Sequence, residues 1–459
     1  MAELDCAFLT YNCGRKEINP EYFAQCLYDA LSEREAPPDI VIFSLQELAQ
    51  LGYAFLGGSF ITPNFKKFEA ALEQATHKFS HNAIRYENLL ATNAGMTGLM
   101  LFAQPEIATN VTKIETGGVG VGNYDLGNKG AVGVRIGYSQ GGEQTEMTFV
   151  AAHLAPAEDA CERRNKDWKD VVQNLVFSPV AKSSRKVNAP LTSETEPLLS
   201  SATDSSNSNS SSSIGIYSPT SHLFVAGDLN YRASDMSPHP DDHKSWAHPS
   251  QDSLSKNGVD AFSTLFQNDQ LTRELHAGRT LHNLTEAPIT FAPTYKYSDK
   301  AQAVAATLAA KAIDQNPLNP LHSTPDIADG EHWIWASHRV PSWCDRILYL
   351  VPPFPGTQPK IGRYVSLPLQ PTSDHQPVLL SFSIPLKAIP ASRDGGQEWL
   401  KVPYPIAENW RERRSMARNT ELLVGVVAYL AMTTEGRMVL GATLIGAFGG
   451  YALIKSLVT

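Results

Sequence analysis

The stretch HLFVAGDLNYR, residues 222–232, joins an apolar run to a polar end. The apolar half has the composition of a buried β-strand. Asp228 and Asn230 are two positions apart, so they project to the same side of an extended chain. Two oxygen-bearing side chains at one strand end are costly to bury but useful for chemistry. The stretch therefore predicts a core strand that ends in a functional site.

Similar apolar runs recur along the chain, and helix-like patterns separate some of them. The further strand candidates are CAFLTYN, DIVIFSLQE, GLMLFAQ, GAVGVRIGY, MTFVAAHL, DRILYLV and PVLLSFSI. Helical patterns cover Pro20–Arg34 and Cys161–Val176. Strands with helices between some but not all of them predict a layered α/β sandwich with mixed strand pairing.

The composition describes a globular protein with a sizeable core, since 42% of the 459 residues are hydrophobic and 19% are charged. A net charge of −9 argues against a general nucleic-acid binder, but it does not exclude a polyanionic substrate, because local charge decides binding. The five cysteines form no CxxC pair, so we expect reduced thiols in a cytosolic compartment.

Two segments depart from the pattern of a folded core. Residues from about 182 to 220 are rich in Ser and Asn, which predicts a disordered surface insertion. A second insertion runs from about Lys300 to His332, and its AQAVAATLAAKAI stretch is Ala-rich and predicted to be helical.

The C-terminal residues have the composition of a membrane tail. An apolar run, Leu422–Met432, is followed by the uncharged run Met438–Ile454, which is 17 residues long and near the lower limit for crossing a bilayer. Upstream lies a basic cluster, which favours the cytosolic leaflet: Arg411, Arg413, Arg414 and Arg418. The tail could cross once or form a hairpin, and a buried core helix is the alternative. The short run suits the thin bilayer of the endoplasmic reticulum.

Polar residues close several of the predicted strands or follow them closely. They are Asn12, Glu47, His153, Asp228, Asn230, Asp345, Asp374 and His375. Carboxylates, amides and histidines without a thiol nucleophile fit a hard divalent cation such as Mg²⁺ and a water nucleophile. No GxxxxGK[ST] loop is present, which disfavours nucleotide binding of that type.

The motifs TYNCG, SLQE, GNKGAVGVRI, HLAPAEDACERRNKDW, VAGDLNYR, PTYKY, VPSWCDRIL and SDHQPV occur in the order typical of inositol polyphosphate 5-phosphatases. The chain therefore resembles this branch of the endonuclease/exonuclease/phosphatase superfamily. The resemblance implies a four-layered α/β sandwich like that of DNase I, with two central mixed sheets flanked by helices. It covers roughly residues 5–385, which places a catalytic domain over 1–387. The composition of the remainder predicts a linker with a basic cluster over 388–420 and a membrane-anchoring tail over 421–459. Such a tail is similar to that of fungal members held at the endoplasmic reticulum.

The resemblance also implies roles for the strand-end residues. Glu47 would be the principal Mg²⁺ ligand, with Asn12 beside it. Asp228 would polarise and deprotonate the attacking water, and Asn230 would orient the water or the phosphate. His153 would contact the scissile phosphate. His375 would contact it as well, held in its tautomer by Asp345. Asp374 would assist the metal or the water.

A polyanionic substrate requires additional positive charge. By the same resemblance, Tyr295 and Lys296 would contact the 4-phosphate. An anion pocket would be completed by Arg346, Lys129, Asn128, Arg163 and Arg164. A solvated helix face is the alternative for the last two arginines.

The sequence thus predicts a membrane-tethered, Mg²⁺-dependent phosphoinositide 5-phosphatase acting on phosphatidylinositol 4,5-bisphosphate, with soluble inositol phosphates as a further substrate class. Many family members carry a second histidine where this chain has Ala157, which keeps open a catalytically impaired scaffold that binds phosphoinositides. A nuclease or sphingomyelinase of the same superfamily is a third alternative, disfavoured because neither would share WCDRIL or PTYKY. No nucleic-acid partner is expected, and the sequence does not identify protein partners.

Overall fold

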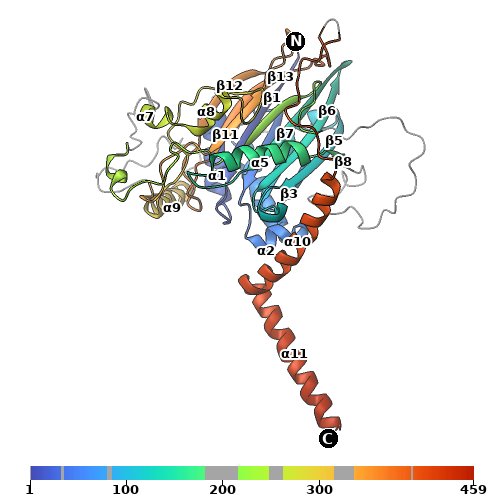
Figure 1. The fold of residues 1–459 in the computed structure, drawn as a ribbon, viewed down its shortest axis with the longest axis vertical. Coiled ribbons are helices and arrows are strands. Elements are labelled where there is room, and N and C mark those ends of the chain that lie inside the picture. The colour runs from blue at the N-terminus through green and yellow to red at the C-terminus, as the bar shows by residue number, and fades with distance from the viewer. Residues whose placement is uncertain are drawn as a thin grey trace, which may run out of the picture.

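The computed structural model describes residues 2–32, 36–79, 85–180, 215–247, 262–314, 335–393 and 396–458. Two β-sheets form its centre (Figure 1). The first has six strands, in the order β12 (Lys360–Ser366), β13 (Val378–Pro385), β1 (Glu3–Asn12), β2 (Ile40–Gln46), β4 (Thr97–Ala103) and β3 (Glu87–Ala94). The second has seven, in the order β10 (Leu284–Glu286), β11 (Asp345–Leu350), β9 (His222–Asp228), β7 (Glu143–His153), β6 (Gly130–Gln140), β5 (Val111–Gly120) and β8 (Ser178–Pro179).

The two sheets pack face to face around an aromatic core. Phe224 of β9 stacks on Phe382 of β13 with ring centroids 4.1 Å apart. Phe8 of β1 meets Phe149 of β7 edge to face at 5.6 Å. Because successive strand residues point to opposite faces, the neighbours of Phe8 lie in a second core on the outer face of the first sheet. Both faces are thus buried, which explains why these strands are apolar almost throughout.

Helices cover the outer faces of both sheets. On the first sheet, α1 (Pro20–Leu31) and α3 (Thr62–His77) bury side chains such as Phe23 and Phe68. On the second, α5 (Cys161–Asn174) buries Trp168. The shorter helices are α2 (Leu51–Leu56), α4 (Pro105–Ala108), α7 (Ser263–Phe266) and α8 (Gln270–His276), and α9 spans Asp299–Asp314. The helix–sheet–sheet–helix order confirms the predicted four-layered sandwich.

Local sequence accounts for where these elements begin. Asn19 precedes α1, and its side chain accepts a hydrogen bond of 2.9 Å from the backbone N–H of Tyr22. Pro20 occupies the first helical turn, where its missing N–H has no cost.

The eight strand candidates are all strands in the structure, whereas β3, β5, β8, β10 and β12 were not predicted. The AQAVAATLAAKAI stretch lies within α9, as expected. Most of the Ser-rich insertion lies outside the described residues.

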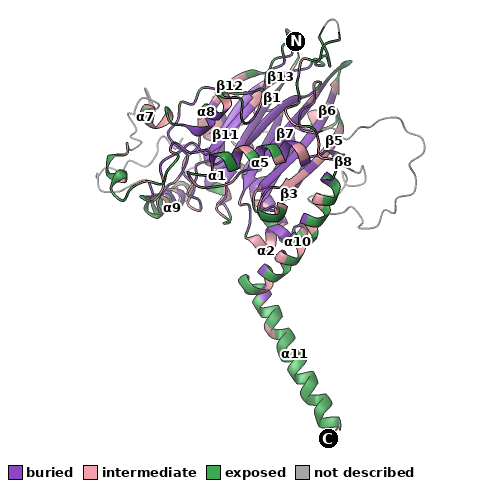
Figure 2. Cartoon of the chain, in the orientation of Figure 1, coloured by how far each residue is buried: buried purple, intermediate pink, exposed green. Residues whose placement is uncertain are grey.

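The C-terminal residues form two long helices, α10 (Trp410–Met432) and α11 (Thr434–Val458). α11 projects from the rest of the molecule and is exposed along almost all of its length (Figures 1 and 2). Within the described residues, one helix is long and apolar enough to cross a membrane, over Thr434–Leu457, with a mean hydropathy of 1.5. α10 differs, because it packs against α2 and buries Gly425 and Ala428. The expected boundary at 420/421 therefore falls inside one continuous helix.

Candidate active site

Strand register brings distant motifs to one point of the second sheet. β7 and β9 run parallel, and His153 is the register partner of Asp228. β11 pairs with β9 in the antiparallel sense, which places Asp345 opposite Asp228 on the other side. Three strand ends thus bring three titratable side chains together.

The first sheet contributes the opposite wall of the site. β1 and β2 run parallel with Asn12 opposite Gln46, so Glu47 follows directly at the same edge. The loop before β13 carries Asp374 and His375. A cavity of about 310 Å³ lies between the two walls and is lined by Asn12, Glu47, His153, Asp228, Asp374 and His375, among others.

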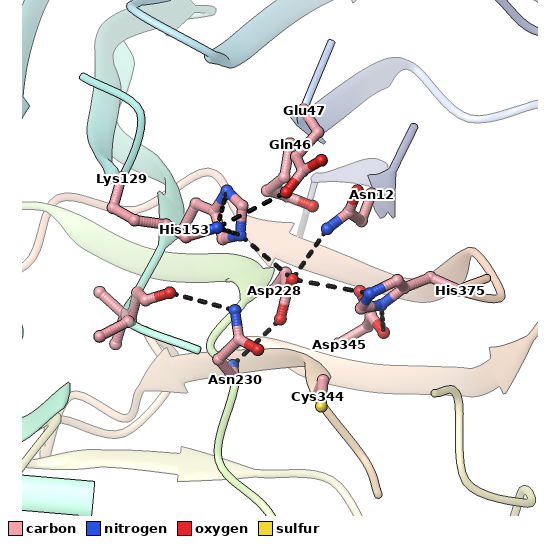
Figure 3. A network of polar contacts seen from close by, with 12 residues as sticks. Asn12, Gln46, Glu47, Lys129, His153, Asp228, Asn230, Cys344, Asp345 and His375 are labelled. Atoms are coloured by element: carbon pink, nitrogen blue, oxygen red, sulfur yellow. Dashed lines mark hydrogen bonds and ion pairs between the residues drawn. The ribbon is translucent and has the colours of Figure 1, made fainter. Parts of the chain in front are cut away.

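Asp228 is the centre of the polar network (Figure 3). Its Oδ2 accepts a hydrogen bond of 2.8 Å from Asn12 Nδ2 and lies 3.2 Å from His153 Nε2. The backbone N–H of Asn230 donates to Oδ1 at 3.1 Å. Burial alone would raise the pKa of Asp228, but the charge of His375 and the hydrogen bond from His153 lower it below its usual range. Asp228 is therefore a carboxylate at neutral pH.

Three residues that line the cavity, glycine aside, adopt left-handed backbone conformations. The φ angle is +64° at Arg15, +46° at Glu47 and +59° at Asn230. Residues other than glycine adopt this region at a cost of about 1–3 kcal/mol, and such strain concentrates at functional sites. The Asn230 side chain is fixed on both sides, because Nδ2 donates to Leu154 O at 3.0 Å and Oδ1 accepts from Arg232.

His375 is held by a second carboxylate. Its Nδ1 lies 2.9 Å from Asp345 Oδ2, which also accepts a hydrogen bond of 2.7 Å from Thr294 Oγ1. Burial disfavours the imidazolium, but the charges of Asp345 and Asp228 outweigh it and raise the pKa of His375 to about 9. The ring carries its proton at neutral pH and can donate a hydrogen bond to an anion in the cavity.

Glu47 lies among cationic groups on the opposite wall. Arg15 Nε is 2.8 Å from Oε2 and Lys129 Nζ is 3.6 Å from Oε1. Burial would raise the pKa of Glu47, but His153, Lys129 and Arg15 lower it. The pKa of His153 is itself lowered, first by burial and then by the charge of Lys129, whose Nζ lies 2.6 Å from Nε2.

The donor set fits a hard divalent cation. The carboxylate of Glu47 and the amide oxygen of Asn12 both border the cavity, and oxygen ligands are those that Mg²⁺ prefers. Asn12 Oδ1 accepts one hydrogen bond, of 3.0 Å from the Gly14 N–H, which leaves one lone pair for a metal. Asp228, Asp345 and His375 also lie close enough together to hold an ion, but His375 is already bonded to Asp345 as an imidazolium. Glu47 and Asn12 are therefore the better candidate ligands.

Residues 9–381 match the model of the Endonuclease/Exonuclease/phosphatase family 2. The chain belongs to this family. Among curated relatives of this family member, the mouse type II inositol 1,4,5-trisphosphate 5-phosphatase is 26% identical over 381 residues, covering 82% of the chain and 30% of the mouse protein. A probable inositol polyphosphate 5-phosphatase of Schizosaccharomyces pombe is 27% identical over 381 residues, covering 78% of the chain and 26% of that protein. The chain thus spans less than a third of the length of these relatives.

A solved structure of the family shares the fold of this member. The inositol polyphosphate 5-phosphatase domain of a synaptojanin, crystallised with inositol 1,4-bisphosphate and calcium, is 20% identical and superimposes with a TM-score of 0.55. The match covers 92% of this chain and 90% of that domain.

The cavity of this family member is lined by most of the predicted site residues. They are Asn12, Glu47, Lys129, His153, Asp228, Asn230, Tyr295, Lys296, Asp374 and His375. Lys296 pairs with Asp374, and the Tyr295 ring lies 4.5 Å from that of His375. Asp345 is not part of the lining, because it stands behind His375.

Arg346 requires a correction. We expected it in the anion pocket, but the side chain is buried and pairs with Asp269 at 3.0 Å and with Glu286 at 2.5 Å. As β11 alternates, Asp345 faces the site and Arg346 the opposite side of the sheet.

Three further pocket candidates also lie elsewhere. Arg164 is fully buried and donates to the carbonyls of Ala155 and Ala157. Arg163 pairs with Asp167 one helical turn away and is partly exposed, which agrees with the helix-face alternative. Asn128 is exposed and lies against Gly122 rather than in the cavity.

Three cationic residues of the cavity were not predicted. Arg15 and Lys16 line it directly after TYNCG, and a basic pair after a polar strand end was the available signal. Arg232 lines it too, with its guanidinium carbon 4.4 Å from the centroid of the Tyr295 ring. Together with Lys129 and Lys296, they give the cavity an excess of cationic groups suited to phosphates.

Proposed function

We propose that this chain is a Mg²⁺-dependent phosphoinositide 5-phosphatase that hydrolyses the 5-phosphate of phosphatidylinositol 4,5-bisphosphate, with soluble inositol polyphosphates as a second substrate class. One observation carries the proposal. A cavity ringed by cationic side chains also holds an ionised carboxylate, Asp228, and a protonated histidine, His375, side by side. The 5-phosphatase names of the curated relatives support the choice of substrate.

The reaction is in-line attack of water on phosphorus, without a covalent phosphoenzyme. Asp228 accepts a hydrogen bond from the water and aligns it. Because its pKa is lowered, Asp228 polarises the water more than it removes a proton from it. The Asn230 side chain, fixed on both sides, keeps the backbone N–H directed at Asp228.

Charge that develops on the phosphoryl oxygens is met by fixed donors. His375, held by Asp345, donates Nε2–H toward the phosphate as this charge develops. Lys129, beside His153, contributes an ammonium group that binds the phosphate already in the substrate complex. Mg²⁺ held by Glu47 and Asn12 would supply Lewis-acid stabilisation of the same oxygens.

The substrate's other phosphates have partners at the rim of the cavity. Lys296 is suited to the 4-phosphate, with Asp374 holding its ammonium group and Tyr295 beside it. Arg15 and Lys16 lie at the opposite wall and are available to a phosphodiester.

We further propose that α11 anchors the protein to the cytosolic face of a membrane, and that this membrane is the endoplasmic reticulum. The support is its length, its hydropathy and an apolar 18-residue window in which no residue is buried. At a rise of about 1.5 Å per residue, 24 residues extend roughly 36 Å, which exceeds a hydrocarbon core of roughly 30 Å.

The test is phosphate release by the full chain reconstituted in vesicles that contain phosphatidylinositol 4,5-bisphosphate, with Mg²⁺ and with EDTA. Soluble inositol 1,4,5-trisphosphate is assayed in parallel, and Asp228→Ala is the inactive control. Mg²⁺-dependent release of the 5-phosphate, lost in the variant, is the expected result. Binding of the lipid without turnover would instead establish the scaffold alternative. Cleavage of a phosphodiester substrate in place of the monoester would establish the nuclease or sphingomyelinase alternative.

A further inference from the structure

α10 touches two of the segments that adjoin residues of the catalytic cavity. One is α2, which begins at Leu51, four residues after Glu47. The other is the loop before Lys129, where Arg413 of α10 forms a bidentate ion pair with Asp125 at 2.6 and 2.9 Å. The helix that leads into the apolar tail is thus built into the edge of the sandwich that carries the site.

Glu421 makes the central contact of α10. The residue is 7% exposed, and its Oε1 accepts a hydrogen bond of 2.7 Å from the backbone N–H of Gly127. Its Oε2 lies 3.3 Å from Arg418, whose guanidinium donates to the carbonyl of Phe55 at 2.7 Å. One carboxylate therefore joins α10 to the loop and, through Arg418, to the end of α2.

Glycines allow this close approach. A Cβ at Gly127 would lie 2.6 Å from Glu421 Oε1, and one at Gly425 would lie 3.0 Å from Phe55 Cβ. On the α2 side, a Cβ at Gly52 would lie 2.8 Å from the backbone nitrogen of Tyr429. Contacts this tight fix the position of α10 against α2 and the loop.

Gly127 is connected to the catalytic groups on both sides. Its carbonyl accepts from the Met96 N–H at 2.8 Å, and the Met96 carbonyl accepts from the Leu48 N–H at 3.2 Å, next to Glu47. Two residues further along the loop stands Lys129, which contacts both Glu47 and His153. A shift of the Gly127 peptide would therefore displace the Lys129 ammonium group.

We propose that Glu421 is a positioning residue for the active site, through which α10 of the tail holds the loop of Lys129 in place. This inference rests on the proposed phosphatase function, because its consequence is substrate affinity. Under this proposal the tail segment both anchors the protein at the membrane and holds an active-site loop in position.

The experiment uses the full chain in detergent micelles with soluble inositol 1,4,5-trisphosphate, so that access to a membrane plays no part. Glu421→Met removes the hydrogen-bond acceptor at similar size, and Glu421→Gln keeps an acceptor oxygen. Glu412→Met is the matched control, because Glu412 is an exposed residue of the same helix. Hydrogen–deuterium exchange over residues 121–129 reports on the loop independently of activity.

For Glu421→Met we expect a KM raised roughly 5- to 20-fold and faster exchange at Gly127, whereas Glu421→Gln and Glu412→Met stay within about twofold of the parent. Partial unfolding would lower kcat and leave KM unchanged, which distinguishes a structural effect from a positioning one. In a Lys129→Ala background, Glu421→Met should raise KM no further, because both changes act through the same ammonium group.

An unchanged exchange rate or an unchanged KM in Glu421→Met would overturn the inference. If the parent protein shows no phosphatase activity, the proposed function fails and the effect on substrate affinity fails with it. Faster exchange in Glu421→Met would then still establish the contact between tail and loop, so the two failures are distinguishable.

Discussion

Replacing Arg346 by Met should destabilise the protein strongly and leave its catalytic constants intact. The guanidinium and the Asp269 side chain are 1% and 0% exposed, and Glu286 is 10% exposed. Methionine fills a similar volume but leaves two acidic side chains without their cation. Removing one partner of a buried ion pair costs about 3–5 kcal/mol, a large part of the 5–15 kcal/mol that stabilises a typical domain.

The assay is urea denaturation followed by tryptophan fluorescence, combined with steady-state kinetics on the folded fraction. Lys166→Met is the control, because Lys166 is largely exposed and its ion pair with Asp170 is of the kind worth about 0.3–0.5 kcal/mol. A KM that rises in Arg346→Met while the free energy of unfolding stays unchanged would refute the reasoning and return Arg346 to the substrate pocket.

Three other predictions concern the site and the tail. Asp228→Asn should lower kcat roughly 10²- to 10⁴-fold without unfolding the protein, and parental turnover in this variant would contradict the assignment. Burial lowers the pKa of His375, but Asp345 and Asp228 raise it to about 9, compared with about 6.5 in the unfolded chain. The contribution of His375 to stability is therefore complete below pH 6.5 and is lost as the pH rises through 9. Urea midpoints measured in EDTA should therefore depend less on pH between 6.5 and 9 in His375→Gln than in the parent. Gly425→Val should weaken the packing of α10 by about 1–3 kcal/mol and expose it to limited proteolysis, whereas Gly441→Val, with open space around its Cβ position, should not.

The sequence predicted a layered α/β sandwich because strand periodicity is a local property, and it predicted the four-layered arrangement because the order of the motifs resembles that of a family of known fold. The strands that it missed have mixed or short patterns, as in β12, where burial is intermittent, and β10, which has three residues. These edge strands are set by pairing with a neighbour, which a local pattern does not encode.

The site residues at strand ends were predictable because the side chains had no structural reason to be polar. The roles of the arginines were not predictable, since a guanidinium serves equally well in a buried ion pair and in an anion pocket. Arg346 pairs with buried carboxylates, whereas Arg232 borders the cavity while it also donates to Asn230. Only the partners distinguish these roles, and the partners are distant in sequence.

The docking of α10 restricts where the protein could act. A flexible linker would let a tethered domain sample a wide volume and reach the surface of a second, apposed bilayer. Here the tail leaves from the edge of the sandwich that carries the site, and Gly425, Glu421 and Arg413 fix its first helix there. Under the proposed anchoring, the cavity stays close to the surface in which α11 is embedded. The protein would then act in cis, on lipids that diffuse to it laterally within its own membrane, and its output would follow the two-dimensional density of substrate in that leaflet.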